Sequence, residues 1–169
     1  MNDFCIFGVA SIIQRIIDKK KHILIQRRQK GGDSPETGLI EIPCGKVKKQ
    51  ESLFECIYKK VQIETGLNIT KIYGKNSFEN KSINGYNVIN YIPFFSSQNI
   101  EKNYPIVLET FICEADGEPF VESKDAKDIH WISLEDLQQL LLENELLFYP
   151  MILMPLKHFI KMELNISTW

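Results

Sequence analysis

The sequence lacks several features that would assign a protein to a specialised class at once. It has only four cysteines and three histidines in 169 residues. No two cysteines form a Cys-x-x-Cys pair and the histidines lie far from them along the chain, so a zinc site is not indicated. We expect buried or free thiols, as is usual in a reducing compartment. The longest apolar segment near the C-terminus, residues 146–156, is too short to span a bilayer and contains two prolines.

The sequence also lacks an excess of charge of either sign. The 20 Lys and Arg residues stand against 22 Asp and Glu residues, which gives a net charge of −2. This balance gives no sign of a general binder of nucleic acid polymers or anionic membranes. Hydrophobic residues make up 44% of the chain, enough for a buried core. The chain begins without a basic region ahead of an apolar one, so we expect no signal peptide and a cytoplasmic location.

Apolar and alternating segments bounded by turn residues predict a series of strands. The expected strands are residues 4–17, 22–28, 39–42, 69–78, 86–95, 106–114 and 129–132. Asn84-Gly85 is typical of the tight turn of a β-hairpin.

Helices are predicted in two regions. Residues 51–64 form an amphipathic pattern in which Leu53, Ile57 and Val61 recur every four residues. C-terminal helices are expected over about 133–163, the last beginning near Pro150 or Pro155 because proline is tolerated in a first turn. The order of strands and helices predicts a single domain over 1–169, with layers packed around a mixed sheet.

The segment most informative about function is residues 45–67, GKVKKQESLFECIYKKVQIETGL. It resembles the signature of the Nudix hydrolases: Gly, five residues, Glu, seven residues, then Arg-Glu-aliphatic-x-Glu-Glu-x-Gly-aliphatic. Lys59 keeps the positive charge of the Arg, whereas Lys60 and Ile63 replace two of the glutamates. The positions that match are Gly45, Glu51, Val61, Glu64, Gly66 and Leu67.

The segments around this motif extend the resemblance over nearly the whole chain. Residues 23–28, 41–45 and 128–134 look like the family's early strand, its strand into Pro-Gly-Gly and its late strand-to-helix element. The resemblance implies an α/β/α sandwich with a central mixed β-sheet. It implies pyrophosphohydrolysis of a nucleoside diphosphate linked to another moiety, with Mg²⁺ or Mn²⁺. The expected partner is a small phosphorylated metabolite or nucleotide rather than a nucleic acid polymer or a membrane; whether the chain forms a homodimer stays open.

The two replaced glutamates weaken the expected metal site. Positions i, i+3 and i+4 share one face of a helix, so residues 60, 63 and 64 are expected to point at one cavity. Divalent ions prefer carboxylate oxygens, and of these three residues only Glu64 remains as the predicted catalytic residue and metal ligand. Asp125 is either an additional metal ligand or part of a solvated loop. We therefore predict weak or absent hydrolysis, with Mg²⁺ or Mn²⁺ if the protein is active and no cofactor otherwise.

Lys60 allows two interpretations. It is either an exposed helix lysine or a tethered ammonium that pairs with Glu64 and binds phosphate in place of a metal. Arg27 and Arg28 are further candidate phosphate ligands, of which strand alternation lets only one face the cleft.

The remaining motif residues are predicted to have structural roles. The resemblance implies that Glu51 and Lys59 form an ion pair between the loop and the helix. Gly45 is expected to provide a special backbone angle or close approach, and Gly66 is expected to end the predicted helix.

Three functions remain open at this point. The first is metal-dependent hydrolysis, and the second is a non-catalytic module that binds a phosphorylated or nucleotide-like metabolite in the same cleft. The third is a scaffold or dimerising protein that has kept only the fold. Metal dependence separates the first two, and stabilisation by a ligand separates the second from the third.

Overall fold

A mixed β-sheet forms the centre of the protein. The computed structural model describes residues 4–29, 34–76 and 79–166, and within them eight strands follow the order β10-β2-β1-β9-β5, with β3 on β2, β4 on β1 and β8 on β9. Among these strands of the described residues, β1 and β9 are the one pair that runs in parallel. The strands of this sheet are β1 (Ile6–Ile17), β2 (Lys20–Arg28), β3 (Ile40–Glu41), β4 (Cys44–Lys46), β5 (Asn68–Ile72), β8 (Phe95–Asn99), β9 (Ile106–Asp116) and β10 (Ala126–Ser133).

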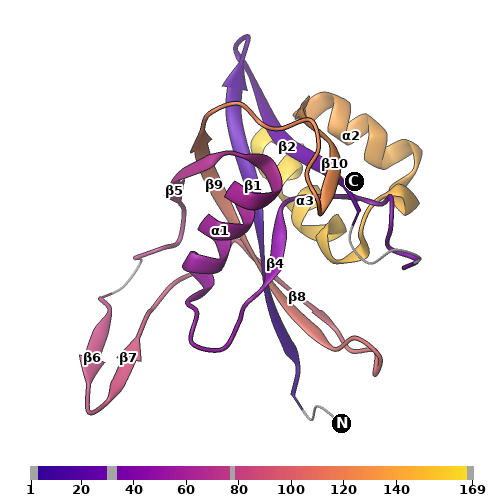
Figure 1. Cartoon of the computed structure of the whole chain (residues 1–169). Helices are drawn as coiled ribbons and strands as arrows, with labels where there is room; N and C mark the ends of the chain where they lie inside the picture. The colour runs from indigo at the N-terminus through magenta and orange to yellow at the C-terminus, as the bar shows by residue number, and fades with distance from the viewer. Residues whose placement is uncertain (1–3, 30–33, 77–78, 167–169) are drawn as a thin grey trace.

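Helices cover both faces of the sheet, as Figure 1 shows. Helix α1 (Leu53–Thr65) packs on one face, and α2 (Leu134–Glu143) and α3 (Pro150–Leu164) pack on the other. A short 3-10 helix, η1 (Glu145–Leu147), joins α2 to α3. The expected α/β/α sandwich with a mixed sheet is therefore confirmed.

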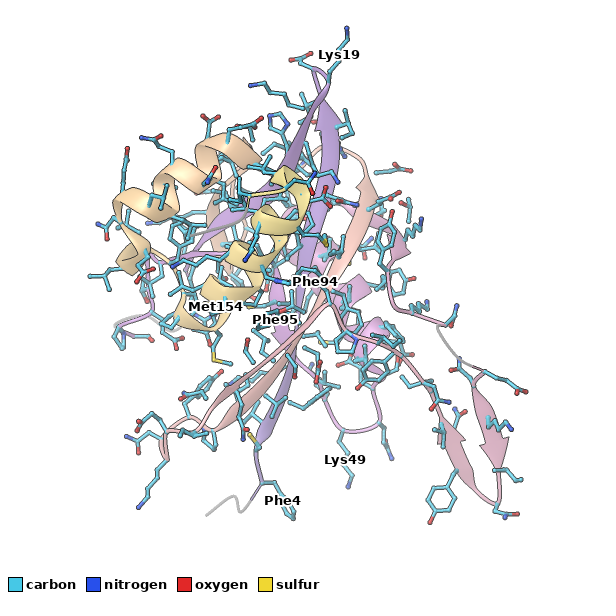
Figure 2. All side chains as sticks on the ribbon, turned by 180° about the vertical axis from the view of Figure 1, so that it is seen from behind. Phe4, Lys19, Lys49, Phe94, Phe95 and Met154 are labelled. Carbon is cyan, nitrogen blue, oxygen red and sulfur yellow. The ribbon has the colours of Figure 1, made fainter. Side chains whose placement is uncertain are left out.

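The β1–β2 hairpin begins the fold. Asp18 and Lys19 have φ angles of 49° and 65°, the left-handed backbone that a two-residue hairpin turn requires. Figure 2 labels Lys19 at the tip of this hairpin and Phe4, which precedes β1, at the opposite end. The sequence predicted both strands to within two residues.

Helix α1 is set by a cap at each end. The Ser52 hydroxyl accepts a hydrogen bond from the Glu55 N–H at 3.2 Å, and the Glu55 carboxylate accepts one from the Ser52 N–H at 2.8 Å. Gly66 ends the helix with φ 78°. The predicted apolar stripe of Leu53, Ile57 and Val61 is buried against the sheet.

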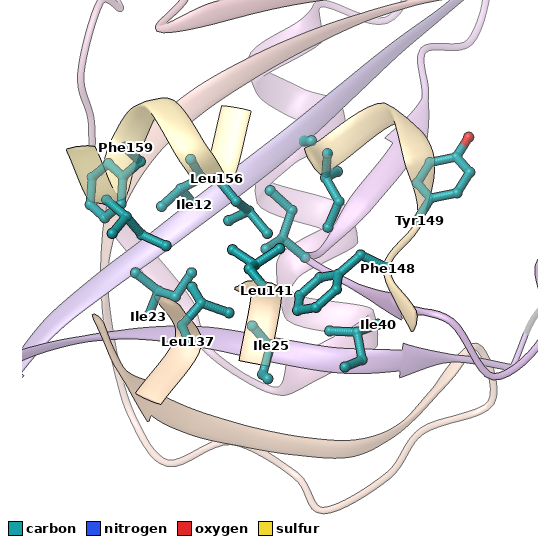
Figure 3. Close-up of a cluster of buried hydrophobic side chains, with 14 of the residues drawn as sticks. Ile12, Ile23, Ile25, Ile40, Leu137, Leu141, Phe148, Tyr149, Leu156 and Phe159 are labelled. Carbon is teal, nitrogen blue, oxygen red and sulfur yellow. The ribbon is translucent and has the colours of Figure 1, made fainter. Parts of the chain in front are cut away.

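The α2–α3 side holds the larger of the two core clusters, part of which Figure 3 shows. Leu137 and Leu141 of α2 meet Leu156 and Phe159 of α3 over the sheet in this cluster. α3 begins at Pro150, as predicted. Pro155, however, lies inside the helix and is buried. The rule that confined proline to a first turn was too strict, because burial of the surrounding apolar side chains offsets one missing backbone hydrogen bond.

The predicted strand over 86–95 is divided in the structure. Its start is β7 (Tyr86–Val88), which pairs with β6 (Lys81–Ile83) in a separate hairpin, and its last residue begins β8. Asn84 and Gly85, with φ angles of 50° and 79°, form the predicted turn of that hairpin. The predicted strand over 69–78 ends at Ile72, and residues 77–78 lie outside the described residues.

Membrane-spanning helices were searched for over the described residues. None of their helices is long and apolar enough to cross a bilayer.

Candidate functional site

A cleft of about 390 Å³ brings the motif together with distant parts of the chain. Strands β2, β4 and β9, helix α1 and the start of α3 contribute to it. Four of the described lining side chains are cationic and none is acidic. The lining residues are Arg28, Cys44, Gly45, Lys46, Lys48, Lys60, Tyr104, Ile106, Leu108 and Tyr149. This charge favours an anionic ligand.

Two buried carboxylates lie behind the cleft and share one amide donor. The Gln26 Nε2 donates to Glu64 Oε2 at 2.9 Å and to Glu41 Oε1 at 3.2 Å. All three side chains are inaccessible to solvent or nearly so. Buried charges need such partners, because an unpaired ionised carboxylate in the interior is strongly unfavourable. Gln26 therefore holds Glu41 and Glu64 in fixed positions beneath the cleft.

The Lys60 ammonium lies where the expected metal ligands meet. Its Nζ is 3.8 Å from Glu64 Oε1 and 3.8 Å from Asp125 Oδ2. The Lys60 stem crosses Gly45, where an added Cβ would lie 2.4 Å from the Lys60 Cγ. Gly45 is thus the residue that allows Lys60 to lie across β4 and reach both carboxylates. Lys60 is 29% exposed and lines the cleft.

The residues present do not fit a divalent metal ion beside this ammonium. Two unit charges of like sign 4 Å apart repel by about 4 kcal/mol at the effective dielectric of a protein surface, and a divalent ion doubles this. No group of three His, Cys, Asp or Glu side chains among the described residues is arranged to hold a metal ion. The Lys60 ammonium already places a positive charge within 4 Å of both Glu64 and Asp125.

Of the two candidate arginines, the strand register turns Arg28 toward the cleft. Its Nη1 lies 2.9 Å from Glu41 and its Nη2 3.0 Å from Glu36, and the guanidinium stacks 5.3 Å from the centre of the Tyr149 ring. Burial lowers the pKa of Arg28, but Glu41, Cys44 and Glu36 together outweigh burial, so the pKa of Arg28 is raised. Arg27 points elsewhere: it contacts Asp128 at 3.3 Å and the Gly38 carbonyl at 3.0 Å.

An ion pair between Glu51 and Lys59 joins the loop before α1 to the middle of the helix. The Lys59 Nζ lies 2.8 Å from Glu51 Oε1, and the Lys48 N–H donates to Glu51 Oε2 at 3.1 Å. The hydrogen bond from Lys59 lowers the pKa of Glu51, and the same bond raises the pKa of Lys59. The contact that the resemblance implied is therefore present, on the solvent side of the helix.

Ile63 does not share the cleft with its neighbours. Its side chain is 60% exposed and is absent from the cleft lining, whereas Glu64 is fully buried. Three residues on one helix face thus have three environments: Lys60 in the cleft, Glu64 beneath it and Ile63 in solvent.

Sequence reasoning missed several cleft residues. Lys46 and Lys48 follow Gly45 in an alternating Gly-Lys-x-Lys pattern that could have indicated an anion site. Tyr104 and Tyr149 come from segments before β9 and α3, and only the fold brings them to the cleft.

Comparison with known proteins agrees with this arrangement. The family model described as the NUDIX domain matches residues 7–151. A solution structure of the E. coli ORF135 protein aligns with a TM-score of 0.65 at 20% identity, covering 98% of this chain and 95% of that one. None of the curated proteins matches the chain.

Two further solved structures are similar to the chain and have a ligand or activity in their descriptions. A C. elegans Ap4A hydrolase in a binary complex gives a TM-score of 0.63 at 12% identity, over 95% of this chain and 99% of that one. The NUDIX domain of Shewanella oneidensis NrtR, solved with ADP ribose, aligns with a TM-score of 0.57 at 16% identity, covering 81% of this chain and 78% of that one. At such identities the likeness shows the fold alone.

Proposed function

Because the chain belongs to the Nudix family, we propose that its cleft binds the diphosphate group of a nucleotide-like metabolite without a metal ion, and that hydrolysis is weak or absent. The observation that carries this proposal is the Lys60 ammonium, 3.8 Å from both Glu64 and Asp125. A fixed ammonium supplies positive charge to phosphate oxygens, as a metal would, but it does not bind and activate a water molecule in the same way.

The rest of the cleft supports an anionic ligand with an apolar or aromatic part. Arg28 lines the cleft with a guanidinium that Glu36 and Glu41 hold in place and that adds positive charge there. The rings of Tyr104 and Tyr149 and the side chains of Ile106 and Leu108 line the remainder. The two similar structures, one described as an Ap4A hydrolase and the other as a complex with ADP ribose, favour a nucleotide as the whole ligand.

Direct binding measurements test the proposal. We would titrate pyrophosphate and ADP-ribose into the protein by calorimetry with excess EDTA, using wild type, Lys60→Met and Lys59→Met. A hydrogen bond to a charged group contributes about 1.5–3 kcal/mol, so Lys60→Met should weaken binding by about 10-fold to 150-fold. Lys59→Met removes the same charge one residue away, outside the cleft lining, and should bind as wild type does.

The thermal midpoint of each variant shows whether it is folded. Equal affinities for a folded Lys60→Met and the wild type would overturn the proposal, and so would binding by the wild type only when Mg²⁺ or Mn²⁺ is added.

A second candidate is metal-dependent pyrophosphohydrolysis. It is favoured by the buried Glu64, which Gln26 holds beside Glu41. If Lys60 moved away, Glu64 and Asp125, each 3.8 Å from its ammonium, would be available to a metal ion instead. A screen of nucleoside triphosphates, ADP-ribose, nucleotide sugars and dinucleoside polyphosphates with Mg²⁺ or Mn²⁺ tests it. Turnover by the wild type that is lost in Glu64→Gln would establish this candidate over the first.

A further inference from the structure

The positive charges of the cleft are of two kinds. Arg28 and Lys60, at the inner end, each lie within 4 Å of two carboxylates: Glu36 and Glu41 for the arginine, Glu64 and Asp125 for the lysine. Much of their charge is therefore already balanced within the fold. A ligand gains less from cations that are shared with carboxylates than from cations that are not.

Lys46 and Lys48 differ from this inner pair. Neither ammonium forms an ion pair with a carboxylate among the described residues, yet both side chains line the cleft. Val47 between them packs on the core cluster beneath α1, so the chain alternates and turns both lysines to the same side. The result is a pair of positive charges at one end of the cleft that, among the described residues, have no carboxylate within ion-pair distance; Lys48 attracts Glu51 only at longer range.

Two contacts fix this end of the cleft. The Lys46 Nζ lies 4.8 Å from the centre of the Tyr104 ring, a cation–π contact that holds the ammonium without neutralising it. The Lys48 backbone N–H donates to the Glu51 carboxylate, which is itself bound by Lys59. Glu51 thus takes its hydrogen bonds from other donors, while the Lys48 ammonium attracts Glu51 at longer range and lines the cleft.

We propose that the cleft selects ligands with a linear chain of at least three phosphoryl groups, and that Lys46 and Lys48 bind the third. The inference rests on the proposed function, in which Lys60 and Arg28 bind the first two groups. A diphosphate linked to a neutral sugar places no charge at Lys46 and Lys48, so it binds more weakly than a triphosphate chain.

A series of phosphate chains tests this directly. Affinities of phosphate, pyrophosphate and tripolyphosphate are measured by calorimetry at constant ionic strength with EDTA. Wild type should bind tripolyphosphate at least tenfold more tightly than pyrophosphate. In the double variant Lys46→Gln/Lys48→Gln this gain should fall to twofold or less, while the affinity for pyrophosphate changes little.

Lys49 supplies the matched control. It follows Lys48 directly but does not line the cleft, and Figure 2 shows it at the outer bend of the loop between β4 and α1. Lys49→Gln should keep the full gain from the third phosphoryl group, although it removes one positive charge from the same loop. Equal losses in Lys49→Gln and in the double variant would overturn the inference, because they would show a general charge effect.

The outcomes separate this inference from the proposed function. Pyrophosphate binding that depends on Lys60, without any gain for tripolyphosphate, would overturn the three-phosphoryl site and leave the proposed function standing. Loss of all binding in EDTA would overturn both. ATP and ADP, measured in the same way, identify the source of the phosphate chain. Tighter binding of ATP than of tripolyphosphate would assign the phosphate chain to a nucleotide. Equal binding of the two would assign it to inorganic polyphosphate.

Discussion

The motif over residues 45–67 has a side that faces solvent and a side that faces the sheet, and the two sides keep different parts of the family's pattern. The half that faces solvent keeps its bracing contact, with Lys59 still paired to Glu51 at 2.8 Å. The half that faces the sheet has exchanged a carboxylate for the Lys60 ammonium, while Glu64 stays buried beneath it. The comparison shows that the residues that build the loop and helix are different from the residues that decide the charge of the cleft. A change on the inner half alters the chemistry of the cleft without removing the helix, its caps or its packing.

The largest effect is expected from returning a carboxylate to the inner half. Lys60→Glu places three carboxylates together without a cation, which should lower the free energy of unfolding by about 3 kcal/mol in EDTA. Mn²⁺ at about 100 times its Kd should restore about 2.7 kcal/mol. Thermal unfolding with EDTA or Mn²⁺ measures both values, and wild type should show no such rise with Mn²⁺.

Ile63→Glu is the control for that variant, because Ile63 is exposed and lies outside the cleft lining. A Mn²⁺ response of Ile63→Glu as large as that of Lys60→Glu would show that the inner half is not where metal binding was lost.

The next effect concerns the amide that joins the two buried carboxylates. Gln26→Leu removes the donor to both Glu41 and Glu64, and each orphaned buried group costs about 1–3 kcal/mol. We expect a loss of about 2 kcal/mol or more in urea unfolding. Gln62→Leu, an exposed glutamine on α1, should change stability by less than about 0.5 kcal/mol. Similar losses in the two variants would contradict the assigned role of Gln26.

A smaller effect is expected where Lys60 crosses Gly45. An alanine methyl at residue 45 would meet the Lys60 stem at 2.4 Å, and the φ of Gly45 is outside the left-handed region. Gly45→Ala should therefore act by displacing Lys60, weakening pyrophosphate binding severalfold and costing about 1 kcal/mol of stability. In the Lys60→Ala background the same change should be nearly neutral. A double-mutant cycle measures this coupling, and strict additivity would exclude the contact.

The smallest effect is expected on the outer half. Because its folded pKa is lowered, Glu51 stabilises the fold above its unfolded pKa of about 4.3, and this stabilisation is lost as the pH falls through the folded pKa. Lys59, whose pKa is raised, stabilises the fold below about pH 10.4, and this is lost as the pH rises through its folded pKa. The difference in Tm between wild type and Glu51→Gln should therefore be small, largest between these limits and reduced by salt. A difference that does not change with pH would reject the ion pair as its cause.

Local pattern was sufficient to predict much of the fold. Helix α1 was predicted from the stripe of Leu53, Ile57 and Val61 and from the helix-ending Gly66. The β6–β7 hairpin turn was predicted from Asn84-Gly85. Each of these signals lies within a few neighbouring residues. The division of 86–95 between two strands could not be predicted in this way, since each part takes its partner from a different region.

The site was harder to predict because long-range register decides it. The sequence offers Arg27 and Arg28 as equals, and the pairing of β2 decides which one reaches the cleft. The joint contact of Lys60 with Glu64 and Asp125 depends on packing between segments about sixty residues apart. Gln26 carries no motif at all, and its importance follows only from the two carboxylates buried beside it.

The contact of Lys60 with Gly45 has a consequence for how the cleft would respond to its surroundings. A site built on a dissociable ion fills according to two concentrations, that of the ion and that of the ligand. The Lys60 ammonium, in contrast, is covalently attached to the helix and packs over Gly45, so a chelator cannot remove it. Under the proposed function, the occupancy of such a site therefore depends on one concentration only, that of the ligand.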